Sequence, residues 1–164
     1  CRMVCLMALS NTHGWLMLNT GNKSEACMGY STLYGDAAGA FAPLGGVYKT
    51  DVFAMARARN RRGAEAGERG PIPVNVFVKP PSAELSPDQE DEKSLGVDYT
   101  TLDRILVAAV EEGATSEAIV ESLAAEGRDG DQVGDLVDRV LARTAANAFK
   151  RALEPPYPAV DFYG

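Results

Sequence analysis

The sequence has no apolar run near the roughly 18 residues that a membrane-spanning helix needs, so we expect no membrane protein. Its three cysteines, an odd number without regular spacing, make no disulfide framework and are typical of free thiols in a reducing cytosol. The chain starts with Cys1 rather than Met and lacks the charged region of a signal peptide. We therefore expect a cytoplasmic protein, of which these residues are a piece.

The sequence contains a single histidine, His13. A Ser-His-Asp triad would have to use it, in a segment expected to be a surface turn. Cys1, Cys5 and His13 contain no closely spaced cysteine pair and make a weak metal-ligand set. We therefore expect core thiols and a loop histidine here.

The 164 residues suffice for one domain, with 46% hydrophobic and 24% charged residues. The net charge of −7 is divided unevenly: residues 1–80 carry +4 and residues 81–164 carry −11. The acidic total argues against non-specific nucleic-acid binding. The basic first part suits an anionic small-molecule ligand.

Residues 1–80 have the pattern of an α/β unit, in which apolar strands alternate with helices. The ligands of such sheets bind at the carboxyl ends of the strands. The first element, 2–9, reads as the end of a buried helix, and 60–73 as a mobile loop. The expected strands are 15–19, 41–44 and 74–78, and the expected helices are 24–33 and 50–59, the latter capped by Thr50 or Asp51.

Residues 81–99 form a proline-rich and acidic loop, and residues 100–164 a helical tail. The first tail helix is capped by Thr100 or Thr101 and turns one apolar face inward, made by Leu102, Ile105, Leu106, Ala109 and Val110. Further helices are expected over 115–125 and 132–152, the latter with Asp129 and Asp131 near its start as caps.

Two short stretches carry candidate chemistry. Thr20–Glu25 places a hydroxyl, free amides and a carboxylate where a strand gives way to a helix, which fits a nucleotide with Mg²⁺ and equally fits a simply capped helix. Lys49-Thr50 fails the phosphate-loop pattern, because Tyr48 replaces its glycine, yet still offers an ammonium and amide donors to a phosphate.

Six motifs occur in order along the chain: Leu6–Asn11, Thr20–Glu25, Gly29–Asp36, Tyr48–Thr50, Lys79–Leu85 and Phe149–Arg151. Together they resemble the synthetase domain of the NAD⁺ synthetase family, more closely its glutamine-dependent form than its ammonia-dependent form. The resemblance implies a partial Rossmann-like parallel sheet of the adenine-nucleotide α-hydrolase type with a helical C-terminal tail. The implied reaction adenylates the carboxylate of deamido-NAD⁺ with ATP and releases pyrophosphate; ammonia then displaces AMP to give NAD⁺.

The same resemblance implies roles for individual residues. Thr20 and Ser82 would contact ATP, Lys49 would hold its phosphates, and Glu25 would bind Mg²⁺ beside the substrate. Lys150 would reach deamido-NAD⁺ and serve as a catalytic residue together with Lys49. The remaining residues expected at the deamido-NAD⁺ site are Tyr30, Ser31, Thr32, Leu33 and Asp36.

The sequence also departs from the family. The Ser-Gly-Gly-x-Asp-Ser pyrophosphate loop does not occur in it, Ala152 and Leu153 replace a usual Arg and Gln, and Ala40 replaces an acidic residue of ammonia-dependent members. We therefore expect no turnover by these residues alone. The parent would carry a nitrilase-like domain that supplies ammonia from glutamine, and would form a homodimer or larger homo-oligomer.

Two alternatives remain open. One is a non-catalytic nucleotide-binding or dimerisation module, and the other is a different ATP-pyrophosphatase amidase, such as a GMP synthetase.

Overall fold

The computed structural model describes residues 1–83, 86–127, 129–159 and 163. Within them the regular structure is helical, and no helix is both long and apolar enough to cross a membrane. The helices are α1 (Arg2–His13), α2 (Lys23–Met28), α3 (Lys49–Glu65), α4 (Asn75–Val78), α5 (Asp91–Leu95), α6 (Tyr99–Val110), α7 (Ser116–Ala124), α8 (Gly130–Ala146) and α9 (Ala148–Arg151).

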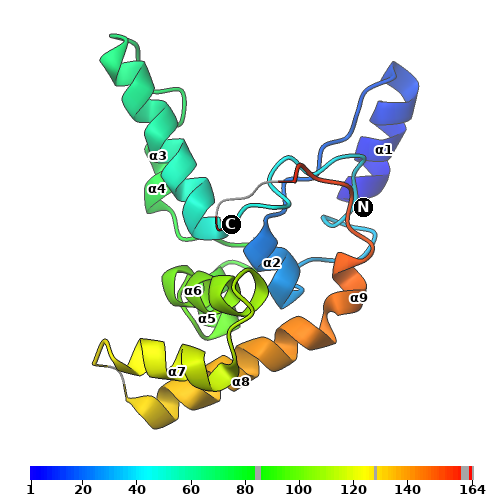
Figure 1. Cartoon of the computed structure of the whole chain (residues 1–164). Coiled ribbons are helices and arrows are strands. Elements are labelled where there is room, and N and C mark those ends of the chain that lie inside the picture. The colour runs from blue at the N-terminus through cyan, green and yellow to red at the C-terminus, as the bar shows by residue number, and fades with distance from the viewer. Residues whose placement is uncertain (84–85, 128, 160–162, 164) are drawn as a thin grey trace.

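The apolar core lies between α6, α7 and α8 (Figure 1). Leu102, Ile105 and Leu106 of α6 are fully buried, as the helical spacing predicts, whereas Val110 is 45% exposed and does not belong to that face. Opposite them lie buried residues of α7 and α8: Ile119, Leu123, Val133, Val137 and Val140. The short helix α2 docks on this core through Cys27 and Met28.

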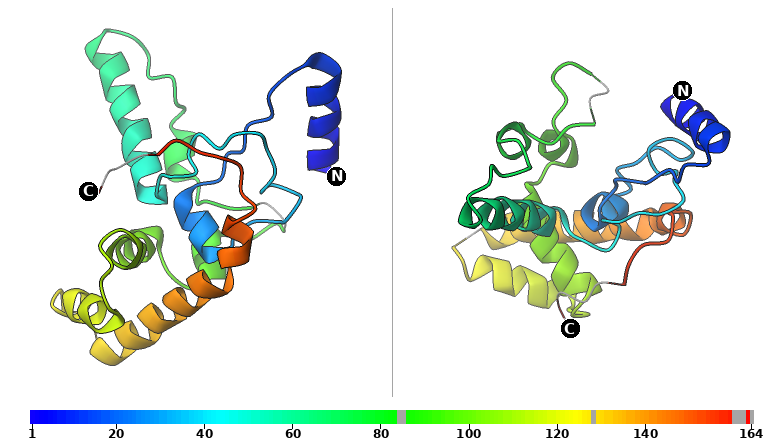
Figure 2. Two further views of the ribbon diagram at one scale, coloured as in Figure 1. Left: turned by 45° about the vertical axis from the view of Figure 1, so that its right-hand side comes forward. Right: turned by 90° about the horizontal axis from the view of Figure 1, so that it is seen from above.

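Two helices stand away from the core. α1 and α3 project on the side of the molecule opposite α7 and α8 (Figure 2). No residue of α1 is buried, and Leu6 and Leu9 are about half exposed. The expectation of a buried helix at 2–9 is therefore wrong for the described residues.

The predicted parallel sheet is also wrong. The segments at 15–19 and 41–44 meet only in an isolated parallel bridge between Leu18 and Phe41, with hydrogen bonds from Asn19 N to Phe41 O and from Ala40 N to Met17 O, each 2.8 Å. Pro43 has no N–H with which to extend the ladder. The N–H of Ala42 is used elsewhere, on Pro156 O at 2.9 Å.

The third expected strand, at 74–78, is instead the helix α4. The N–H groups of Val76 and Phe77 donate to Pro73 O and Val74 O, so this segment satisfies its backbone locally. The expected loop at 60–73 is helical up to Glu65. Asn60 then bonds both backbone groups of Ile72 and holds the returning chain against α3.

Several helix ends differ from the predicted ones. α2 stops at Met28 because Gly29 adopts the left-handed conformation that ends helices. The side chain of Asp98 caps α6, rather than Thr100 or Thr101. The expected helix at 132–152 is interrupted at Asn147, whose side chain bonds Arg143 O and competes with the helical pattern. Thr115 and Asp129 cap α7 and α8, and α5 interrupts the expected acidic loop.

Candidate functional site

The start of α2 is a capped helix terminus. Asn22 Oδ1 accepts the N–H of Glu25 at 3.1 Å, and Glu25 Oε2 accepts the N–H of Asn22 at 3.3 Å. This reciprocal pair satisfies two backbone donors that would otherwise lack partners. It also fixes the Glu25 carboxylate at the first turn of the helix.

The free side of that carboxylate meets the ammonium of Lys49. Lys49 Nζ lies 2.8 Å from Glu25 Oε1, and the two side chains are only 17% and 20% exposed. The same ammonium lies 5.2 Å from the ring centre of Tyr99, which adds a favourable cation–π contact. Two residues 24 positions apart in sequence thus form one charged pair.

A buried carboxylate joins the elements that carry this pair. Asp103 of α6 accepts Ser24 Oγ at 2.5 Å, and its other oxygen accepts Thr50 N and Thr50 Oγ1, each at 2.8 Å. Ser24 Oγ in turn accepts the N–H of Lys49 at 2.8 Å. Burial raises the pKa of Asp103, and the bonds from Ser24 and Thr50 oppose that rise.

The C-terminal end of α2 rests on basic side chains. Arg143 donates to Met28 O at 2.9 Å, and Arg151 donates to Cys27 O at 3.3 Å. Lys150 Nζ donates to Gly29 O at 2.7 Å and Ser31 O at 2.8 Å. Cations at the carbonyl end of a helix complement its dipole. These three residues therefore support α2 and the segment that follows it.

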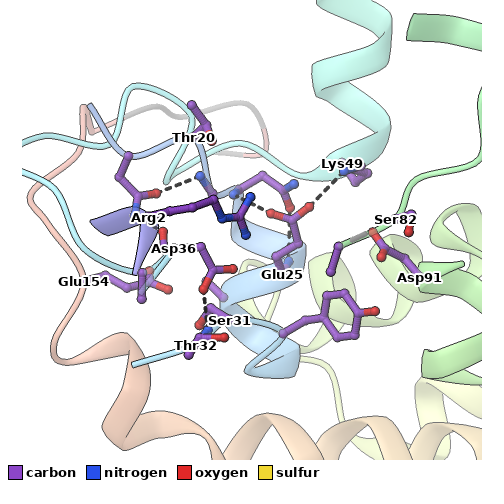
Figure 3. Close-up of a pocket in the computed structure, with 17 residues that line it drawn as sticks. Arg2, Thr20, Glu25, Ser31, Thr32, Asp36, Lys49, Ser82, Asp91 and Glu154 are labelled. Atoms are coloured by element: carbon purple, nitrogen blue, oxygen red, sulfur yellow. Dashed lines mark hydrogen bonds and ion pairs between the residues drawn. The ribbon is translucent and has the colours of Figure 1, made fainter. Parts of the chain in front are cut away.

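A cavity of about 380 Å³ lies beside the start of α2 and the Glu25–Lys49 pair (Figure 3). Of the ten predicted site residues, eight line it, and Leu33 and Lys150 do not. Lys150 instead holds the backbone on which Ser31 lies. The eight lining residues are Thr20, Glu25, Tyr30, Ser31, Thr32, Asp36, Lys49 and Ser82.

Hydrogen bonds bring the separate segments of the cavity wall together. Asn19 Nδ2 donates to Asp36 O at 2.8 Å, and Asp36 Oδ1 accepts the N–H of Thr32 at 2.6 Å. Gln89 Nε2 donates to Tyr30 Oη at 2.9 Å and ties the proline-rich segment to the end of α2. Two motif residues of that segment, Glu84 and Leu85, lie outside the described residues.

Sequence reasoning missed several residues of the site, among them Asp91. This residue is 4% exposed and lines the cavity; one of its oxygens accepts Tyr99 Oη at 3.2 Å, and Oδ1 has no partner within the described structure. Glu154 also lines the cavity. Burial raises its pKa, Arg151 opposes the rise, and Glu25 adds to it. Arg2, Asn19 and Asn22 complete the missed polar lining.

The lining has more acidic than basic side chains. The acidic lining residues are Glu25, Asp36, Asp91 and Glu154, and the basic ones are Arg2 and Lys49. Such a wall would repel bare triphosphate and is better matched to an anion that brings its own divalent cation. In the described part of the chain, no group of three or more His, Cys, Asp or Glu could hold a metal ion by itself.

Residues 1–154 match the model of the NAD synthase family. The chain belongs to this family. It is 48% identical over 147 residues to the glutamine-dependent NAD⁺ synthetase of Thermotoga maritima, covering 89% of this chain and 23% of that protein. It is 37% identical to the NH₃-dependent NAD⁺ synthetase of Wolinella succinogenes, covering 94% of this chain and 52% of that protein.

A solved structure of the same family is similar to this chain. A glutamine-dependent NAD⁺ synthetase from Cytophaga hutchinsonii superposes with a TM-score of 0.72 at 26% identity, covering 98% of this chain and 24% of that one. The fold of this NAD synthase family chain is thus shared with that enzyme. The chain spans about a quarter of the length of the glutamine-dependent relatives described here.

Proposed function

We propose that this chain provides the ATP-binding and dinucleotide-binding wall of an enzyme that amidates deamido-NAD⁺ to NAD⁺. One observation carries the proposal: eight residues assigned from separate motifs come together around a single cavity. The names of the relatives support the same activity. Membership of the NAD synthase family speaks against a GMP synthetase.

In this proposal Lys49 binds the phosphates of ATP. Its ammonium is already held at the cavity wall by Glu25, so little side-chain freedom is lost when a phosphate binds. Positive charge there would stabilise the pyrophosphate that leaves as the substrate carboxylate attacks the α-phosphate. Thr20 and Ser82 line the same cavity and are assigned to ATP.

The part of the cavity wall that follows α2 is assigned to deamido-NAD⁺. Tyr30, Ser31, Thr32 and Asp36 follow α2 and form a turn closed by the bond between Asp36 and Thr32. Leu33 belongs to this segment without lining the cavity. Lys150 donates to the carbonyl groups of Gly29 and Ser31 and so supports this segment. We retain Lys150 as a catalytic candidate for the amidation step.

Glu25 fits the ligand expected for Mg²⁺. A magnesium ion is commonly bound by one or two carboxylates together with substrate phosphates, so a dedicated protein cage is unnecessary. Glu25 Oε2 makes one long hydrogen bond, at 3.3 Å, and keeps lone pairs for a cation. When bound, Mg²⁺ would neutralise phosphate charge and orient the triphosphate.

The nitrogen source follows from the same comparison. We propose glutamine as the source in the full-length protein, through a nitrilase-like domain, because most of the similar proteins described above carry the glutamine-dependent name. We also propose a homo-oligomer. The 164 residues alone are expected to be inactive, because they contain no Ser-Gly-Gly-x-Asp-Ser loop.

The test uses the intact polypeptide that carries this chain. It is incubated with deamido-NAD⁺, Mg·ATP and either ammonia or glutamine, and NAD⁺ and AMP are quantified. We expect equimolar NAD⁺ and AMP, and loss of both in Lys49→Met. Lys93→Met, which removes an exposed lysine paired with Glu90, is the matched control and should keep activity. A folded protein that forms no NAD⁺ from either nitrogen source contradicts the proposal.

A further inference from the structure

Asp103 is a charged residue on the buried side of α6. Its neighbours on α6, Leu102 and Leu106, are fully buried in the core, and Asp103 itself is only 3% exposed. A buried carboxylate is costly unless donors satisfy it. Three donors do so here, and all come from Ser24 and Thr50 rather than from α6.

These two donor residues are the sequence neighbours of the charged pair. Ser24 immediately precedes Glu25, and Thr50 immediately follows Lys49. Ser24 Oγ also accepts the N–H of Lys49. One carboxylate therefore fixes the backbone beside both members of the pair.

Asp103 also substitutes for a missing cap. Tyr48 occupies the N-cap position of α3 and makes no side-chain cap hydrogen bond. The first N–H groups of a helix need an acceptor from elsewhere. Asp103 of α6 accepts the N–H of Thr50 and so caps the N-terminus of α3, whose first residue is Lys49.

We propose that Asp103 is a positioning residue of the synthetase site, which holds the Lys49 ammonium opposite Glu25. It acts through the backbone of α2 and α3 and does not touch the ligand. The inference rests on the proposed function, since Lys49 is taken to bind ATP phosphates. Small displacements of such a group are costly, because phosphate stabilisation depends on a preformed geometry.

The chain offers a closely matched control. Asp98, the N-cap residue of α6, accepts Thr101 N at 2.9 Å on one oxygen and Thr101 Oγ1 at 2.8 Å on the other. Asp103 accepts the same two kinds of donor from Thr50, both on a single oxygen. Asp98→Asn and Asp103→Asn thus perturb the same kind of cap. Asp103 bonds Ser24 and Thr50, beside Glu25 and Lys49, whereas the bonds described here for Asp98 go to Thr101.

The experiment measures Mg·ATP binding by calorimetry and NAD⁺ formation by steady-state kinetics in the intact polypeptide, with both variants kept well below their melting temperatures. We expect Asp103→Asn to weaken ATP binding and kcat/KM for ATP by about tenfold, or about 1.4 kcal/mol, and Asp98→Asn to leave both within about twofold. In a Lys49→Met background, in which NAD⁺ formation is expected to be lost, Asp103→Asn should add almost nothing to the loss of Mg·ATP affinity, because its effect passes through Lys49.

Three results decide the matter. Equal effects of the two aspartate substitutions, or an Asp103 effect that adds fully to Lys49→Met, overturn the positioning role. If Asp103→Asn does not fold, Thr50→Val, which removes one of the three donors, is measured against Thr101→Val by the same criteria. Wild-type protein that binds ATP but makes no NAD⁺ overturns the proposed substrate, and Asp103 is then judged by ATP affinity; failure to bind ATP overturns both.

Discussion

Lys49 Nζ and Glu25 Oε1 lie 2.8 Å apart at the wall of the cavity, so the cation that we propose for phosphate binding and the carboxylate that we propose for Mg²⁺ neutralise each other before any ligand arrives. Each side chain is mostly buried. Removal of one partner leaves an uncompensated charge on the other. The two residues therefore act as a unit, and their single substitutions should not be additive.

Glu25→Gln should raise the Mg²⁺ concentration needed for half-maximal activity. The amide keeps a similar shape but loses the charge that binds a hard cation. An Mg²⁺ titration of NAD⁺ formation, at fixed total ATP, measures the shift, which we expect to be about tenfold or more. Glu90→Gln, in the exposed Glu90–Lys93 pair, is the control. An unchanged Mg²⁺ requirement would remove Glu25 from the metal-ligand role.

Lys150→Met should raise KM for deamido-NAD⁺ by about tenfold, because Gly29 O and Ser31 O lose their donor and residues 29–32, which we assign to this substrate, are held less firmly. Steady-state kinetics with deamido-NAD⁺ as the varied substrate measures this. Arg139→Met is the control. Arg139 lies on α8, the helix before the one that carries Lys150, and it donates to Gly96 O rather than to the cavity wall. A fall in kcat at saturating substrate would add the catalytic role; unchanged kinetics would exclude both.

The stability contributed by Glu111 should depend on pH. Burial alone would raise its pKa, but hydrogen bonds from Lys23 and Tyr48 outweigh burial and hold the pKa below 4.5. Because the folded-state pKa is depressed, this contribution is fully present above about pH 4.5 and is lost as pH falls through the folded-state value.

Glu111→Gln should therefore destabilise the protein by no more than about 1 kcal/mol near neutral pH, and by less in acid. Urea denaturation of wild type and variant across this pH range measures the difference. Neighbouring Glu112→Gln serves as the control. A difference that grows towards acid pH would contradict the assignment.

Cys27 should resist thiol reagents in the folded protein. Burial raises its pKa to about 11, so about one molecule in a thousand carries the thiolate at about pH 8. Alkylation followed by mass spectrometry, with and without urea, should show Cys27 modified only after unfolding. Cys27→Ser provides the control for peptide assignment. Rapid modification in native conditions would contradict the burial of this side chain beside Met28.

Much of the site could be predicted from local sequence, because each motif places its polar residues within a few positions of one another. Thr20, Glu25 and Lys49 come from two such stretches and line one cavity, while their roles stay predictions. Asp103 could not be assigned that way, since its partners Ser24 and Thr50 lie 79 and 53 positions away in sequence. A signal for Asp103 was present: a carboxylate interrupts the apolar stripe of α6 between Leu102 and Leu106.

The fold was predicted best where helical periodicity is strong. Leu102, Ile105 and Leu106 of the expected apolar face of α6 are buried, whereas Val110 is exposed. The sheet could not be judged from the segments at 15–19 and 41–44 alone, because strands depend on neighbours, whereas helices bond within themselves. Pro43 was the local warning, since it ends the ladder after one bridge.

The placement of the core has a consequence for the order of folding. Most of its residues lie between Leu95 and Val140, so the chain closes only short loops to bring them together. We expect α6–α8 to gain protection from hydrogen exchange first during refolding, with α2 docking afterwards through Cys27 and Met28. The charged pair of Lys49 and Glu25 would then be among the last features to form.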